Sequence, residues 1–262
     1  MNAEKRIKNN NDGFRAVNIA LLVDCGPSDE TRKIACKSDS SAYTYAVEVD
    51  KCPRDDTRAA ACKDSYSAYE YALDVDKCPR DDTRKAACME GITALKYALE
   101  VDKCPRDDTR KGACKYFLCA YDYALKVDKC SRNDTRKAAC KNAGSAYSYA
   151  LYVDKRPCNS TRKAACMNAM YAYLYARDVD KRPHDDTRKA ACLCPSEAYS
   201  YALKIDKCPR DDTREAASKD DYYASKYASE IDNNEKDSPS QCGLLREEGT
   251  GKSDVGRRKC AT

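Results

Sequence analysis

The chain is 262 residues long, with a net charge of +5 and 35% charged residues. Leu, Ile, Val and Phe together make up about 12% of it, a level at which chains are normally disordered because they bury too little apolar area. The 18 Cys, 20 Tyr and frequent Ala allow a core of another kind. No apolar run reaches the roughly 18 residues that a membrane helix needs, so the composition excludes a membrane-spanning protein and a membrane partner.

A unit of 26 residues is repeated eight times, from residue 24 to residue 231. Each copy opens with an aspartate: Asp24, Asp50, Asp76, Asp102, Asp128, Asp154, Asp180 and Asp206. Counted from this Asp as position 1, seven positions never vary: Asp at 1, Thr at 8, Arg at 9, Tyr at 22, and Ala at 12, 19 and 23. A degenerate half-copy at 14–23 precedes the array. A unit this short cannot bury its own apolar face, so the copies must stack.

The second half of each copy has the apolar spacing of a helix. Ala68, Tyr71, Ala72 and Val75 stand at i, i+3, i+4 and i+7, which is one stripe of a helical period. The same spacing returns in the other copies, and only the row that contains Glu70 is left polar. We therefore expect a helix that packs on several sides.

The first half of each copy predicts a shorter helix. Pro53 cannot stand in a helix interior and marks a turn, after which Asp55 or Asp56 is expected to cap the helix N-terminus. Ala60 and Ala61 follow, and small residues allow neighbouring helices to approach closely. The invariance of position 12, here Ala61, favours such a contact over helix propensity alone.

Two short helices in each stacked copy predict an all-α protein, an α-solenoid of eight 26-residue helix-turn-helix repeats with a degenerate N-terminal capping helix. We expect a polar N-terminal tail at 1–13, the solenoid at 14–231 and a disordered C-terminal tail at 232–262. The N-terminal apolar run lacks the pattern of a signal peptide, which favours a cytoplasmic location.

The unit DDTRKAAC…AYxYALxVDK resembles a family of short two-helix repeats, about 25 residues long, found in bacterial, amoebal and large-virus proteins. Repeats of that family have an acidic helix start, a small-residue first helix and a second helix of the form A-L-x-Y-A, which Ala68, Tyr71 and Ala72 match. This chain departs from them in Cys at position 13 and in the CPRDDTR turn. The resemblance implies an α-solenoid and no assigned chemistry.

Cysteine recurs at position 13 in seven copies and at position 3 in five. Matching position 13 with position 3 of the following copy leaves fewer residues unmatched than matching within a copy. The resulting pairs are Cys36 with Cys52, Cys62 with Cys78, Cys88 with Cys104, Cys114 with Cys130, and Cys192 with Cys208. Cys140 has a near match at Cys158. Proximity is predicted, and its chemistry stays open between buried thiols, which are favoured, disulfides and a metal site, which the single His and the lack of C-x-x-C disfavour.

The invariant Asp and Arg flank the Pro turn, as Asp50 and Arg58 do. A repeated Arg–Asp clamp that fixes this turn, with Asp55 and Asp56 as acidic neighbours of the Arg, is a simpler interpretation than ligand binding. Catalysis needs different residues that converge at one place, whereas every chemical group here recurs along the array. We therefore predict a non-enzyme with no catalytic residue, metal or cofactor, and we interpret His184 as a surface variant.

Lysine dominates the exposed positions 10 and 14 of the first helices. The set, called the lysine ridge below, is Lys33, Lys37, Lys63, Lys85, Lys111, Lys115, Lys137, Lys141, Lys163, Lys189 and Lys219. Such rows suit the phosphates of a polyanion, so nucleic acid is one candidate partner. The alternative is that Lys only keeps a repetitive surface soluble.

The most variable positions, 15 to 18, are expected in the loop between the two helices. Their aromatic and Met residues are Tyr66, Tyr116, Phe117, Met170, Tyr171, Tyr222 and Tyr223. Such residues on one edge suit a partner-specific surface, or they fill gaps between repeats. The leading hypothesis is a non-enzymatic scaffold for another protein; a polyanion binder and a purely structural rod are the alternatives.

Overall fold

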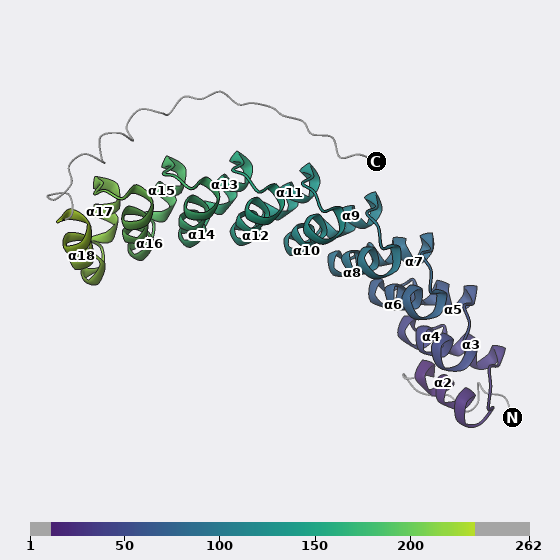
Figure 1. Ribbon diagram of the computed structural model, residues 1–262. Helices are drawn as coiled ribbons and strands as arrows, with labels where there is room; N and C mark the ends of the chain where they lie inside the picture. Colours follow the sequence, from purple (N-terminus) through teal and green to yellow (C-terminus); the bar gives the residue numbers. More distant parts are fainter. Residues whose placement is uncertain (1–11, 234–262) are drawn as a thin grey trace. The chain divides into compact units, whose positions relative to one another are not determined.

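The computed structural model describes residues 12–233, and its elements are helices throughout (Figure 1). They follow one another as regular pairs, which confirms the predicted α-solenoid of two-helix repeats. Residues 1–11 and 234–262 of the predicted tails lie outside the described residues. The predicted solenoid bounds of 14 and 231 are too narrow, because the described helix α2 already includes Asp12 and Gly13, and Asp232 ends the last helical segment and pairs with Arg214.

The chain forms two compact units, of which the first ends at Lys129 and the second begins at Cys130. The first unit contains α2 (Asp12–Leu22), α3 (Asp29–Ala35), α4 (Asp39–Tyr45), η1 (Ala46–Asp50), α5 (Asp55–Ala61), α6 (Ser65–Glu70), η2 (Tyr71–Asp76), α7 (Asp81–Ala87), α8 (Gly91–Lys96), η3 (Tyr97–Asp102), α9 (Asp107–Ala113), α10 (Phe117–Asp122) and η4 (Tyr123–Asp128). Each η element is a π-helix that continues the α-helix before it.

The second unit repeats this order. It contains α11 (Asn133–Ala139), α12 (Ala143–Ser148), η5 (Tyr149–Asp154), α13 (Asn159–Ala165), α14 (Ala169–Tyr175), η6 (Ala176–Asp180), α15 (Asp185–Ala191), α16 (Pro195–Tyr201), η7 (Ala202–Asp206), α17 (Asp211–Ala217), α18 (Asp221–Tyr227) and η8 (Ala228–Asp232).

Within each unit the helices form two layers. In the first unit the second helices α4, α6, α8 and α10 contact one another in order, and α7 contacts α9 in the layer of first helices. Within a unit a second helix also packs on the first helix of the following copy, as α4 does on α5 and α6 on α7 (Figure 1). A copy that has neighbours on both sides within its own unit is therefore covered by both of them.

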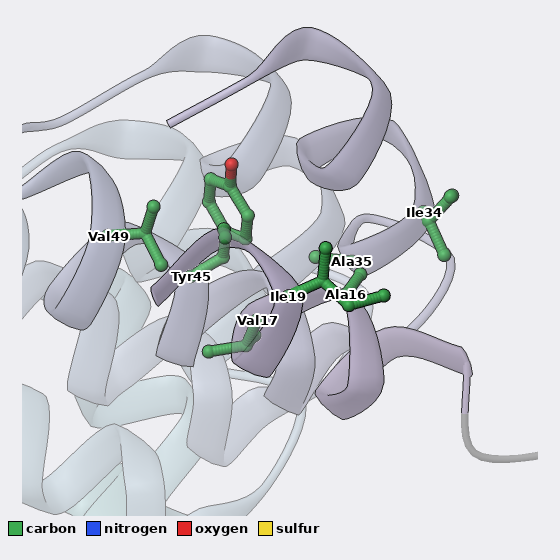
Figure 2. Packing of buried hydrophobic residues seen from close by; sticks show 8 residues of the cluster. Ala16, Val17, Ile19, Ile34, Ala35, Tyr45 and Val49 are labelled. Atoms are coloured by element: carbon green, nitrogen blue, oxygen red, sulfur yellow. The ribbon is translucent and has the colours of Figure 1, made fainter. Parts of the chain in front are cut away.

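The half-copy closes the N-terminal end of the first unit. Helix α2 packs against the first full copy, and the buried residues of this cluster are Ala16, Val17, Ile19, Ala20, Ile34, Ala35, Tyr45 and Val49 (Figure 2). This arrangement matches the capping helix that the sequence predicts.

The interior core is built from small residues and tyrosine. Ala61 and Tyr71 of one copy pack with Ala46 of the preceding copy, and none of the three is exposed. The alanine side chains allow the helices to pack closely. One buried tyrosine ring in each copy fills the space that large aliphatic residues occupy in other proteins. The low aliphatic content therefore reflects the kind of core and not its absence.

Each second helix changes its hydrogen bonding before it ends. In the π-helical segment an N–H group reaches back five residues, as the N–H of Lys51 does to the carbonyl of Ala46 at 2.9 Å. The wider turn brings Asp76, position 1 of the following copy, to Arg58 on the first helix of its own pair. The sequence predicted only an α-helix here, because the apolar stripe does not distinguish the two kinds of turn.

A lysine in the left-handed conformation follows each of the segments η1 to η7, with φ between 52° and 54°. A side chain with a Cβ is strained there, and glycine is not. Lys77→Gly is therefore expected to raise the free energy of unfolding by about 0.5–1 kcal/mol, measured by urea denaturation. Lys77→Ala, which keeps the Cβ, is the control; an equal gain from the alanine variant would contradict this explanation.

Candidate interaction surface

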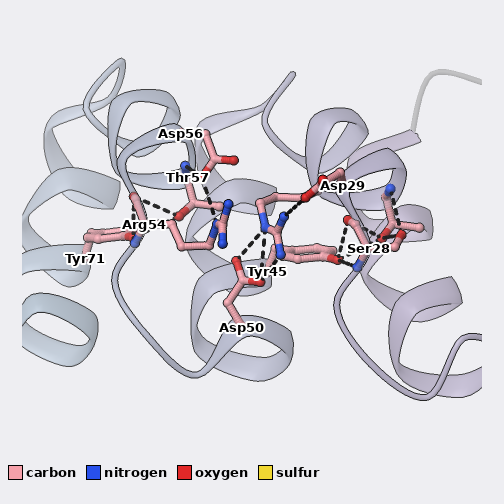
Figure 3. Close-up of polar contacts among 10 residues, drawn as sticks. Ser28, Asp29, Tyr45, Asp50, Arg54, Asp56, Thr57 and Tyr71 are labelled. Atoms are coloured by element: carbon pink, nitrogen blue, oxygen red, sulfur yellow. Dashed lines mark hydrogen bonds and ion pairs between the residues drawn. The ribbon is translucent and has the colours of Figure 1, made fainter.

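The invariant Thr and Tyr of each copy form a buried hydrogen-bonded node. The hydroxyl oxygens of Thr57 and Tyr71 are 2.8 Å apart, and neither residue is exposed. The N–H of Arg54 donates to the Tyr71 hydroxyl at 3.0 Å, and this hydroxyl donates to the Arg54 carbonyl at 3.1 Å (Figure 3). The node fastens the end of the second helix to the backbone that enters the first helix.

The invariant Arg and Asp form a buried ion pair beside this node. Arg58 Nε lies 3.0 Å and 3.1 Å from the two carboxylate oxygens of Asp76, and its Nη1 lies 2.6 Å from Asp55 Oδ1. Its guanidinium carbon is 5.7 Å from the centre of the Tyr71 ring. The predicted clamp exists, and Asp55, an expected acidic neighbour of the Arg, takes part in it. The Asp that precedes the turn does not, because Asp50 binds Arg32 of the preceding copy.

The predicted N-cap is also wrong in its position. Arg54 occupies the N-cap of α5 in an extended conformation, and Asp55 and Asp56 are the first two helical residues. Asp56 accepts a hydrogen bond from the N–H of Thr57 at 2.9 Å. The node explains the difference, because the Tyr71 hydroxyl holds the N–H and the carbonyl of Arg54 at the point where the helix begins.

The last copy opens the same buried groups to solvent. The Arg214 side chain is 44% exposed and that of Asp232 is 33% exposed, against 5% and 1% for Arg84 and Asp102. Ser225 and Ser229, where most copies have Tyr and Leu, are exposed on this copy. Polar residues at these positions are typical of a terminal capping repeat.

The lysine ridge is exposed at all eleven of its positions. One member has a structural contact, because Lys115 Nζ donates to the carbonyls of Cys88 and Met89 at 3.0 Å and 2.8 Å. The same first helices begin with exposed acids, such as Asp55 and Asp56. The ridge is therefore accompanied by an acidic row at the other end of these helices.

The aromatic and Met residues at positions 15 to 18 do not lie in a loop, as was predicted. The connection is tight, since the N–H groups of Lys63 and Asp64 bond back to carbonyls of the first helix. The second helix therefore starts earlier and carries these residues on its first turn or at its N-cap. Tyr66, Tyr116, Met170 and Tyr222 are exposed there.

The other three residues of this predicted set are partly buried and pack on neighbouring rings. The Tyr171 ring centre is 6.0 Å from that of Tyr147, and the Tyr223 centre is 5.9 Å from that of Tyr199. Phe117 lies 4.6 Å from Tyr116 by the same measure. Tyr171 and Tyr223 therefore fill space between copies, which was the alternative that the sequence left open, whereas Phe117 packs on the adjacent ring of its own copy.

Further apolar residues, which were not among those predicted for this surface, are exposed at positions 14 and 17. In the first unit Met89, Ile92 and Leu118 are 48%, 55% and 47% exposed. They accompany Tyr66 and Tyr116 on consecutive copies, and a Cβ on Gly91 would lie 3.1 Å from that of Tyr116. We call these five residues of the first unit the apolar edge. Scanning positions 14 and 17 for apolar replacements would have found its missing members.

Met167, Met170, Leu193 and Tyr222 occupy the equivalent positions of the second unit, where all four are exposed. The edge residues therefore recur in both units at the same repeat positions, while their identity changes from copy to copy.

A second set of contacts joins successive copies. The hydroxyl of Tyr43 donates to Asp74 at 2.7 Å, and that of Tyr69 donates to Glu100 at 2.6 Å. Burial, followed by the hydrogen bond to Glu100, raises the pKa of Tyr69. The sequence signal for these contacts is a Tyr at position 20 followed by an acid at position 25 of the next copy.

The position 13 cysteines are half-buried thiols. Burial, followed by the charge of Asp56, raises the pKa of Cys36 to about 11. Burial followed by Asp82 does the same for Cys62. The pairing of the cysteines, such as Cys36 with Cys52 and Cys62 with Cys78, stays a prediction, and so does its chemistry.

No family model, curated protein or solved structure matches the chain, so the resemblance to short two-helix repeats remains a prediction. Among residues 12–233, no helix is long and apolar enough to cross a membrane.

Proposed function

We propose that the chain is a non-enzymatic scaffold that binds another protein along the apolar edge. The observation that carries this proposal is the contrast between invariant residues, which are buried, and variable apolar residues, which are exposed. The invariant residues are used inside the fold, in the node formed by Thr57 and Tyr71 and in the adjoining ion pair. The apolar residues that change from copy to copy are exposed on one side of the helix pairs.

The apolar edge has the character of a binding surface. Tyr and Met are enriched at protein interfaces, and contiguous exposed apolar residues are uncommon on monomeric proteins. Tyr66, Ile92 and Leu118 stand on α6, α8 and α10, which contact one another in order. Tyr116 is the N-cap of α10, and Met89 lies in the turn before α8. A partner lying across these helices would bury side chains from several copies at once. Its affinity would depend on which apolar residue each copy exposes.

The test is capture of a partner from the native source by the full chain and by matched variants. The edge variant is Ile92→Glu with Leu118→Glu, and the control is Leu99→Glu, which changes an apolar residue that is 37% exposed on η3. Acidic residues are tolerated in the first turn of a helix, so the edge variant is expected to fold. We expect the wild type and the control to retain a common partner and the edge variant to lose it.

Equal capture by all three proteins would contradict binding through the apolar edge. Capture by none of them would favour the purely structural rod.

The exposed lysine ridge supports polyanion binding as a second candidate. Its neutralisation of phosphates would make affinity fall steeply with salt. A titration of the full chain with single- and double-stranded nucleic acid at increasing salt tests it, and a flat response would remove it. The exposed acids Asp55 and Asp56 on the same helix favour the protein partner.

A further inference from the structure

The turn that opens the sixth copy differs from the others in the place of its cysteine. Five copies have Cys at position 3 and six have two acids before the invariant Thr, whereas the sixth copy reads Arg156-Pro-Cys158-Asn159-Ser160. The departure moves the cysteine by two positions and replaces the acid at position 7 by Ser160. In a regular array, a local exception of this kind is where a specific function is expected.

The moved cysteine meets the position 13 cysteine of the preceding copy. Cys158 Sγ lies 3.2 Å from the hydroxyl oxygen of Ser160. The same hydroxyl hydrogen-bonds to Cys140, and the charge of Cys158 acts on Cys140 directly. Two thiols from successive copies therefore converge on one serine hydroxyl, and both are partly exposed to solvent.

The two thiols differ in their ionisation. Burial raises the pKa of Cys158, but hydrogen bonds from the Ser160 hydroxyl and from the N–H groups of Ser160 and Thr161, together with Arg136, lower it below its ordinary value. For Cys140, burial and then the neighbouring Cys158 raise the pKa to about 11. At neutral pH Cys158 is therefore the thiol that ionises more readily, and Cys140 is held protonated.

We propose that Cys140 and Cys158 form an oxidation-sensitive dithiol site that locks the fifth copy to the sixth. A low-molecular-weight disulfide is the oxidant. The Cys158 thiolate attacks one sulfur of this disulfide, which releases one thiolate and leaves a mixed disulfide on Cys158. Cys140 then loses its proton and attacks the Cys158 sulfur, which releases the second thiolate. The two protein thiols are oxidised by two electrons, and the small disulfide is reduced to two thiols.

The surroundings of Cys140 differ from those of the other position 13 cysteines. In other copies the acid at position 7 lies beside the position 13 thiol and raises its pKa, as Asp56 does for Cys36. Ser160 removes that charge and supplies a hydrogen bond. Cys166, at position 13 of the sixth copy itself, still faces Asp186 and has a pKa raised to about 11, first by burial and then by this acid.

Alkylation with iodoacetamide under native conditions tests the first step on the full chain. The pKa of Cys158 lies below the ordinary thiol value of 9.0, and that of Cys166 is raised to about 11. Cys158 therefore carries at least about a hundredfold more thiolate, against about tenfold less intrinsic nucleophilicity. Cys158 is therefore expected to react about tenfold faster than Cys166 at neutral pH. Peptide mass mapping separates the two, because trypsin places them in different peptides.

Treatment with oxidised glutathione tests the second step. We expect a crosslink between the tryptic peptides 138–141 and 156–162, its loss on treatment with dithiothreitol, and a higher melting temperature of the oxidised protein. Cys140→Ser should leave the alkylation of Cys158 fast and stop oxidation at the glutathione adduct. Ser160→Asp, which restores the acid of other copies, should slow both steps while circular dichroism shows an unchanged fold.

Equal alkylation of Cys158 and Cys166, or a glutathione adduct on Cys158 that Cys140 fails to displace, would overturn the proposal. Neither result bears on the apolar edge, which lies in the first unit, so the site and the scaffold function stand or fall separately.

Discussion

Arg84→Ala is expected to lower the free energy of unfolding by about 3–5 kcal/mol, the usual effect of removing one partner of a buried ion pair. Arg84 Nε donates to both carboxylate oxygens of Asp102, at 2.9 Å and 3.1 Å, and its Nη1 donates to Asp81 at 2.7 Å. The side chain of Asp102 is only 1% exposed. Its charge would stay buried without a partner, and denaturation by urea followed by circular dichroism measures the loss.

The last copy supplies the matched control. Arg214 makes the same contacts with Asp232, at 3.2 Å and 3.4 Å from Nε, but both side chains are well exposed. Arg214→Ala should therefore cost no more than about 1 kcal/mol, as for other solvent-exposed pairs. Similar losses from the two variants would show that burial of the pair is not what makes it important.

Tyr97→Phe is expected to lower the free energy of unfolding by about 1–3 kcal/mol, the cost of leaving buried polar groups without a partner. The hydroxyl of Tyr97 lies 2.9 Å from that of Thr83, and it also bonds to the N–H and the carbonyl of Arg80 at 3.1 Å each. Phenylalanine keeps the ring and its packing. The change therefore isolates the hydrogen bonds of the node, again by urea denaturation.

Tyr69→Phe is the control for this prediction. Its hydroxyl binds Glu100, which is exposed and can turn to water when the bond is lost. We expect a loss of less than about 1 kcal/mol, the net value of one ordinary hydrogen bond. If this variant lost as much as Tyr97→Phe, the special position of the node would be contradicted.

The periodicity was sufficient to predict the fold. A repeat of 26 residues with two apolar patterns fixes the number of copies, the helix pairs and their stacking. The invariant Ala61 and Tyr71 are both fully buried, as their periodic spacing predicted. These features were predictable because each depends on local spacing, and the same spacing recurs in every copy.

Contacts between positions far apart in the copy were harder to predict. The clamp was expected between Asp50 and Arg58, whereas Arg58 bonds to Asp76, 18 residues later. Sequence proximity favoured the first partner, but the π-helical turn at the end of the second helix brings the second one back to the first helix. Because the unit repeats, both pairings fit the sequence equally well, and only the geometry of the turn separates them.

The candidate surface was predicted in part. Tyr66 is exposed, as its variable position suggested, but Phe117 packs against a neighbouring ring. Ile92 and Leu118 were missed because single apolar residues in a helix are more often part of a core. Their exposure depends on how the preceding copy covers the start of each second helix, which the pattern within one copy does not contain.

The fixed spacing between each Arg and its Asp has a consequence for how such a chain can change in length. Each interior copy packs its Tyr and Ala against an Ala of the preceding copy, as Tyr71 and Ala61 do against Ala46, and pairs its Arg with the Asp that opens the next copy. Deleting or duplicating one whole period inside a unit would leave every Arg with an Asp 18 residues downstream, as Arg58 has Asp76. A deletion of any other length would shift the register and leave buried charges unpaired. Stability thus filters length changes in steps of 26 residues, whatever the exposed residues of the inserted copy happen to be.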